Sequence, residues 1–150
     1  MHSTQLFIKS ISVLDSQVGK LLLLSPELSV ATVQDLMSRA GINDLITDSP
    51  QLSSIASHWR TFENAQNEHP LCQTEWLLTT SGTTARPKLI TRNLRELAEN
   101  VSAPAANVRP VWGLLYEASR FAGIQVIFQS LLSGGLLIAP SQALSFSDRV

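Results

Sequence analysis

The chain has 150 residues, of which 44% are hydrophobic and 15% charged, and its formal net charge is -1. This length predicts one domain with a sizeable core, whereas the charged fraction lies well below the typical value of about one quarter, so we expect a covering partner. The near-neutral charge argues against nucleic-acid binding through a basic surface. The single cysteine, Cys72, excludes an internal disulfide, and neither a targeting segment nor a membrane span is recognisable. We therefore expect a cytoplasmic protein.

The first third of the chain has the pattern of a strand, a helix and a second strand. Residues 19–25 form an apolar run that ends at Pro26. Apolar residues then recur at helical spacing over residues 30–40, and Gly41 is suited to end that helix. A second apolar run covers residues 42–47. Together these segments predict a βαβ unit with parallel strands.

The rest of the chain continues this alternation after a polar stretch at residues 51–70, for which we expect a weak helix leading into a loop. Further strands are predicted at residues 75–80, 87–91, 111–115 and 136–139. Helices are predicted after Asn93, a suitable N-cap, and over residues 121–132, where Gly134 and Gly135 follow. The pattern indicates an α/β fold with layers of helices on a mostly parallel sheet.

A turn rich in hydroxyl groups joins the strands predicted at 75–80 and 87–91. Hydroxyls and main-chain N–H groups donate to phosphate oxygens, glycine lets the backbone approach closely, and a lysine supplies a positive charge. The composition therefore suits a polyphosphate. The hydroxyls belong to Thr79, Thr80, Ser81, Thr83 and Thr84, the glycine is Gly82, and the nearby cations are Arg86 and Lys88.

Composition alone leaves a second interpretation of this turn open. Serine, threonine and glycine are common in ordinary turns, and such a cluster is most often only a turn. The segment also lacks the Gly-Lys-Ser/Thr sequence of the common nucleotide-binding loop. If it binds ATP, it is a loop of another kind.

The whole string Thr80–Lys88, TSGTTARPK, resembles the phosphate-loop signature of the adenylate-forming superfamily, which includes acyl-CoA synthetases and nonribosomal peptide adenylation domains. The resemblance extends over most of residues 20–140. It includes the LITD sequence at Leu45–Asp48 and the helix start at Arg92–Leu94. It also includes the segment Tyr116–Gly123 and the turn Leu132–Gly135.

The resemblance implies a fold, a reaction and a set of site residues. The fold is part of the family's N-terminal domain, so residues 1–150 form a single partial domain. The reaction joins a carboxylate to the α-phosphate of ATP, with Mg²⁺, and then passes the acyl group to a thiol of CoA or of a carrier protein. Lys88 is implied to be catalytic by neutralising leaving-group charge. The residues implied to bind the β- and γ-phosphates are Thr80, Ser81, Gly82, Thr83, Thr84 and Lys88, and no metal ligand is assigned.

The sequence departs from the family pattern in three places. Ala85 stands where the family usually has a second glycine, and Tyr116 and Glu117 replace the commoner aromatic–aspartate pair. The family's adenine- and ribose-binding segments and its C-terminal domain have no counterpart in these 150 residues. Because positioning of the reactants supplies much of the rate, about 7–11 kcal/mol of the barrier, we expect negligible turnover by this chain alone.

Three functions follow as alternatives. The first is a split or truncated adenylating enzyme that a separate C-terminal polypeptide complements. The second is a non-catalytic nucleotide-binding module, and the third is an interaction domain that forms a homo-oligomer through apolar surface. No role is expected for the scattered histidines, and the tryptophans are expected in the core. Phe121, Gln125 and Phe128 fit an acyl pocket and an amphipathic core face equally well.

Overall fold

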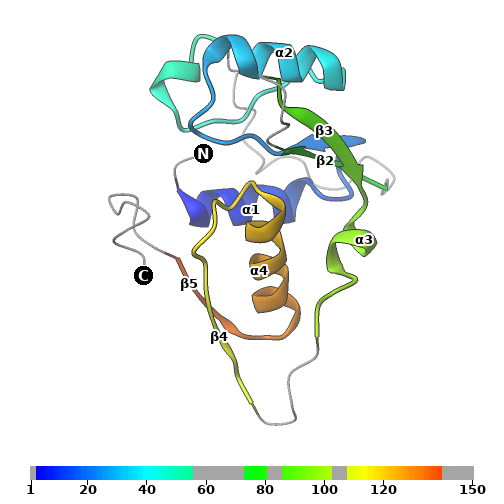
Figure 1. Ribbon diagram of the computed structural model, residues 1–150, viewed down its shortest axis with the longest axis vertical. Coiled ribbons are helices and arrows are strands. Elements are labelled where there is room, and N and C mark those ends of the chain that lie inside the picture. Colours follow the sequence, from blue (N-terminus) through cyan, green and yellow to red (C-terminus); the bar gives the residue numbers. More distant parts are fainter. Residues whose placement is uncertain (1–2, 56–72, 81–85, 103–107, 140–150) are drawn as a thin grey trace.

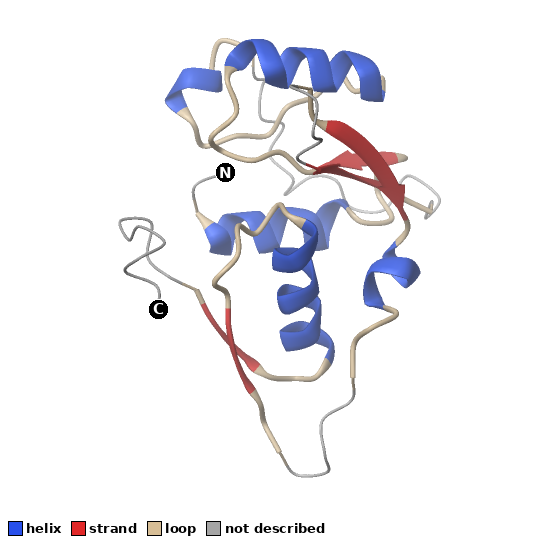
Figure 2. Cartoon of the chain, in the orientation of Figure 1, coloured by secondary structure: helices blue, strands red, loops and turns tan. Residues whose placement is uncertain are grey.

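The computed structural model describes residues 3–55, 73–80, 86–102 and 108–139. Within these ranges the architecture is α/β, which confirms the predicted fold class. Figure 1 shows helices on both sides of one sheet, and Figure 2 shows that the strands form two separate groups. No helix in the described ranges is long and apolar enough to cross a membrane.

The first sheet contains β1 (Lys20–Leu22), β2 (Glu75–Thr80) and β3 (Lys88–Arg92), in the order β1-β2-β3. β1 pairs with β2 in parallel, and β2 pairs with β3 in antiparallel orientation. Apolar side chains alternate across β2, so Trp76 and Leu78 enter the main core while Leu77 is buried on the other face. The strands predicted at 75–80 and 87–91 are thereby confirmed.

The predicted strand at residues 42–47 is wrong. This segment belongs to neither sheet, and the parallel partner of β1 is β2. Leu45 is buried beside Val33 and Leu52 in a second, smaller core cluster, whereas Asn43 and Asp44 are exposed. The apolar run is therefore explained by packing beneath a helix and not by strand pairing.

Helix α2 (Val30–Ala40) covers one face of the first sheet and has both ends that its sequence predicts. The Ser29 side chain accepts a hydrogen bond from the Thr32 N–H at its start. Gly41 adopts the left-handed conformation, φ 67°, at its end. A short 3₁₀-helix, η1 (Pro50–Leu52), follows, and residues 56–70 of the predicted polar helix and linker lie outside the described ranges.

Helix α1 (Thr4–Leu14) was not predicted. Ser3 caps it by accepting from the Leu6 N–H, and Phe7, Ile11 and Leu14 bury one face at spacings of four and three residues. The segment is rich in β-branched residues, which obscures this helical pattern in the sequence.

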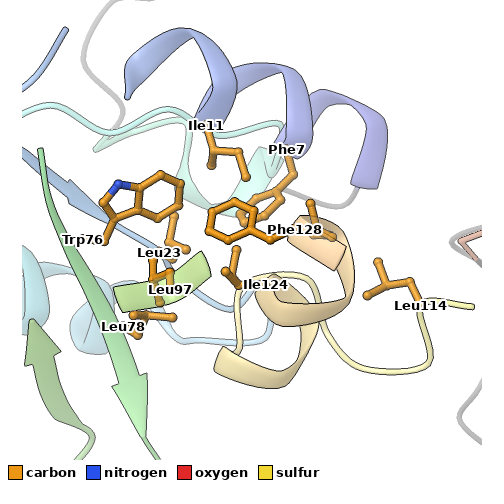
Figure 3. Packing of buried hydrophobic residues seen from close by; sticks show 10 residues of the cluster. Phe7, Ile11, Leu23, Trp76, Leu78, Leu97, Leu114, Ile124 and Phe128 are labelled. Atoms are coloured by element: carbon orange, nitrogen blue, oxygen red, sulfur yellow. The ribbon is translucent and has the colours of Figure 1, made fainter. Parts of the chain in front are cut away.

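The main core lies between the first sheet and the helices α1, α3 (Leu94–Ala98) and α4 (Phe121–Leu132), as Figure 3 shows. Asn93 and Glu96 form a reciprocal capping box at the start of α3, which confirms the predicted N-cap. The capped helix places Leu97 at 0% exposure in this core. The fully or nearly buried members are Phe7, Ile11, Leu23, Trp76, Leu78, Leu97, Leu114, Ile124, Ile127 and Phe128.

The second sheet is the parallel pair β4 (Val111–Gly113) and β5 (Leu136–Ile138), joined through α4. Gly134, with φ 65°, allows the chain to turn from the helix into β5. Val111, Leu136 and Ile138 are 50–61% exposed and alternate with half-buried neighbours. We call these three side chains the outer face of the second sheet.

Candidate polyphosphate-binding site

The two described ends of the hydroxyl-rich segment lie where β2 ends and β3 begins. Thr80 is the last residue of β2 and Lys88 the first of β3, and the two are directly opposite each other in the strand register. Because the strands pair up to this point, the two ends of the segment are held at the spacing of neighbouring strands. The predicted cation and the first predicted hydroxyl therefore belong to one structural unit.

The residues at the ends of β2 and β3 differ in their exposure to solvent. Thr79 is 6% exposed and belongs to the interior, whereas Thr80 is half-buried and Lys88 is exposed. Thr79 is therefore part of the interior, whereas Thr80 is partly accessible to solvent. The predicted residues Ser81, Gly82, Thr83 and Thr84, with Ala85, lie outside the described ranges, and their roles stay predictions.

Positive charge collects on the stem that leaves the loop. Arg86 and Lys88 are both exposed, and neither β2 from Trp76 onward nor residues 86–92 contain an acidic residue. An exposed ammonium and an exposed guanidinium at one end of a hairpin attract an anion by Coulomb force. The stem thus has the charge that the sequence predicts for a phosphate site.

A third basic residue approaches this stem from helix α2. The Arg39 Nη1 donates to the Pro87 carbonyl at 3.1 Å and to the Asp35 Oδ2 at 3.1 Å. The sequence does not predict this contact. The spacing of Asp35 and Arg39 predicts an ion pair along one helix, but nothing in the sequence indicates that the helix end reaches Pro87.

The segment Tyr116–Gly123 forms the entry to α4. Glu117 accepts hydrogen bonds from the Ser119 hydroxyl and the Arg120 Nε, and Tyr116 is 57% exposed. Gly123 is buried, and a Cβ atom there would overlap the Glu117 carbonyl oxygen. The glycine is therefore required for the close packing of α4 against residues 117–118.

The structure distinguishes between an acyl pocket and a core face for Phe121, Gln125 and Phe128. Phe128 is buried in the main core, and the Gln125 side chain donates to the Leu97 carbonyl of α3. These two residues hold elements together, which favours the core interpretation. Phe121, at 46% exposure, lies at the solvent-facing start of α4 and is outside that core cluster.

A cavity of about 420 Å³ lies elsewhere, between α1, β1 and residues 41–52. Its walls are mainly apolar, with Phe7, Ile11, Leu23, Met37 and Leu45 among them. No residue of the described loop stem lines it. The cavity is therefore separate from the candidate polyphosphate site.

Comparison with known proteins gives a class of fold. No protein-family profile and no curated protein matches the chain in sequence. Solved structures match 86–97% of it, and they show that its fold is shared with part of a coenzyme A synthetase. The resemblance seen in the sequence is confirmed at the level of fold.

The matching structures include O-succinylbenzoate CoA synthetase, MenE, from Bacillus subtilis. Its complex with ATP and magnesium has 18% identity and a TM-score of 0.68, and the match covers 95% of this chain and 42% of that chain. Its complex with the acyl-adenylate intermediate has 17% identity and a TM-score of 0.69, with 97% and 43% covered. The chain thus spans less than half the length of the structures that it matches.

Proposed function

We propose that the chain binds the polyphosphate of ATP at the loop between Thr80 and Lys88. In this proposal it is the phosphate-binding part of a system that activates a carboxylate as an acyl-adenylate. The acyl group is then transferred to a thiol of CoA or a carrier protein. The observation that supports the proposal is the register pair Thr80–Lys88, which brings together the two ends of the family-like sequence in a fold shared with MenE.

The described side chains fit a polyphosphate and give each stem residue a role. Lys88, exposed at the start of β3, neutralises charge on the departing pyrophosphate. Thr80 donates its hydroxyl to a phosphate oxygen, and Ser81, Gly82, Thr83 and Thr84 extend the donor set. Magnesium, when bound with ATP, would offset the negative charge of the phosphate groups. The described residues contain no group of three metal-binding side chains, so we assign none to it.

A complete reaction needs more than this chain. The match covers 42–43% of the MenE chains, so groups that orient adenine, ribose and the carboxylate must come from additional polypeptide. We therefore propose that turnover requires a complementing polypeptide. Pyrophosphate release that depends on a carboxylate, seen only when such a polypeptide is added, would support this step.

Thermal unfolding with and without Mg-ATP tests the nucleotide site. A ligand at a hundred times its Kd adds about 2.7 kcal/mol of stability, which for a chain of this size raises Tm by roughly 5–10 °C. We expect this rise in the wild type, a smaller one in Lys88→Ala, and the full rise in Lys9→Ala. Lys9 is a matched control because it is an exposed lysine on α1 and losing it changes the net charge equally.

The alternative outcome leads to a different function. A cooperative melt that Mg-ATP does not shift would contradict nucleotide binding and leave the interaction module as the explanation. The specific observation that favours that second candidate is the exposed outer face of the second sheet: Val111, Leu136 and Ile138. Apolar side chains that gather on one face mark protein–protein contacts.

A further inference from the structure

Arg39 links helix α2 to the stem of the candidate phosphate loop. Its Nη1 lies 3.1 Å from the Pro87 carbonyl oxygen and 3.1 Å from the Asp35 Oδ2. The Arg39 and Asp35 side chains are 38% and 42% exposed, so solvent screens their ion pair and its strength alone is small. The geometry of the contact, and not the ion pair, is what distinguishes Arg39.

Helix α2 is a rigid support for this side chain. Val33, Leu36 and Ala40 are buried at 0–4% exposure, Ser29 caps the start, and Gly41 closes the end. Arg39 lies in the last turn, where the helix dipole favours a positive charge. The guanidinium therefore starts from a fixed backbone.

The Pro87 carbonyl is a sensitive point of the loop stem. It belongs to the same planar peptide unit as the Lys88 N–H, so a hydrogen bond to the oxygen orients the plane from which Lys88 begins. The ring of Pro87 already fixes its own φ. On the other side, Thr80 opposite Lys88 holds the lysine in the strand register. Lys88 is thus held between β2 and α2.

From this arrangement we infer that Arg39 is a positioning residue for Lys88, with Asp35 orienting the guanidinium. The inference rests on the proposed function, because it assigns Arg39 to the polyphosphate site without a contact to the ligand. Its effect is transmitted through the Pro87–Lys88 peptide. In a nucleotide site of this kind, Arg39 sets the affinity by keeping the lysine in place.

The first test is a double-mutant cycle on the Kd for Mg-ATP, measured by calorimetry. Loss of this partly solvent-exposed hydrogen bond predicts binding that is about three- to tenfold weaker in Arg39→Ala. Arg39→Lys should recover part of it, since one donor remains. In a Lys88→Ala background the same Arg39→Ala change should cost less than about twofold, because residues that act as a unit are not additive.

The matched control is Arg95→Ala, which removes the same charge from an exposed arginine of α3, beyond the far end of β3. We expect no change in its Kd. Equal effects of Arg39→Ala in the presence and absence of Lys88 would overturn the inference, because Arg39 would then act on the ligand independently. A lower Tm with an unchanged Kd would also overturn it.

Hydrogen exchange separates this inference from the proposed function. In Arg39→Ala, the amides of Arg86 and of residues 88–92 should exchange faster than in the wild type, whether or not ATP is added. Arg95→Ala should match the wild type in this segment. If the wild type does not bind Mg-ATP, the proposed function fails, while faster exchange would still show that Arg39 holds the stem. Unchanged exchange in Arg39→Ala would refute the positioning role directly.

Discussion

At the residue scale, two tryptophans differ in whether the indole N–H has a hydrogen-bond acceptor. The Trp76 ring is 1% exposed, meets Phe128 edge-on, and donates from Nε1 to the Asp15 Oδ1 at 2.8 Å. Trp112 is half-buried, and its Nε1 is the one buried side-chain nitrogen or oxygen of the described ranges that lacks a hydrogen-bond partner. An unpaired buried donor costs free energy that a paired one does not.

Replacing each tryptophan by phenylalanine should therefore give unequal losses of stability. Trp76→Phe removes a satisfied hydrogen bond and leaves a cavity in the core, and we expect it to cost about 2–4 kcal/mol. In Trp112→Phe the lost volume is offset by removal of the unpaired donor, so the cost should stay below about 1 kcal/mol. Urea unfolding of both variants measures the two values, and equal losses would contradict this account.

The sequence predicts the burial of Trp76 but not its acceptor. Aromatic bulk alone indicates the core, whereas Asp15 becomes its partner because α1 ends beside β2. Arg39 and Pro87 are a similar case, since their contact joins a helix end to a distant loop stem. The sequence predicted that Thr80 and Lys88 lie near the ends of two strands, but it did not predict the long-range contacts of Arg39 and Trp76.

At the scale of elements, the sequence predicts the ends of a helix correctly where a capping residue or a turn determines them. Gly41 ends α2, Asn93 begins α3, and both were predicted. The apolar run 42–47 failed as a strand because burial under a helix and burial in a sheet produce the same short pattern. The helical signal of α1 is present at Phe7, Ile11 and Leu14 but is masked by intervening β-branched residues.

Gly123 gives an element-scale prediction about how α4 begins. Alanine favours a helix by up to about 1 kcal/mol, yet a Cβ at Gly123 would overlap backbone atoms of Glu117 and Ala118. Backbone cannot give way as a side-chain end can, so we expect Gly123→Ala to lose about 1–3 kcal/mol. Gly113→Ala is the control, because a Cβ there meets nothing within 4 Å. A more stable Gly123→Ala protein in thermal unfolding would disprove the close packing.

At the scale of the whole molecule, the described residues leave one face of the second sheet exposed. α4 packs against one face, while Val111 and Ile138, on the outer face, are 61% and 57% exposed. Parallel sheets are usually covered on both sides. The alternation of elements predicted an α/β fold, but the division into two sheets depends on contacts between distant segments that local patterns do not encode.

We expect the outer face to drive association of the isolated chain. The double variant Val111→Lys/Ile138→Lys should sediment as a smaller species than the wild type at the same concentration, because charged side chains oppose apolar contact. Val13→Lys/Val108→Lys is the control, since Val13 and Val108 are also exposed and lie outside the outer face. Wild-type protein that remains monomeric at every concentration would contradict the expectation.

The same two tryptophans have a consequence for spectroscopy. Trp76 belongs to the first sheet and Trp112 to the second, so each sheet contains its own fluorophore. In Trp112→Phe the emission change on unfolding comes from Trp76 and Trp59, and in Trp76→Phe from Trp112 and Trp59. Comparison of the two emission curves thus distinguishes sheets that unfold as one cooperative unit from sheets that unfold separately.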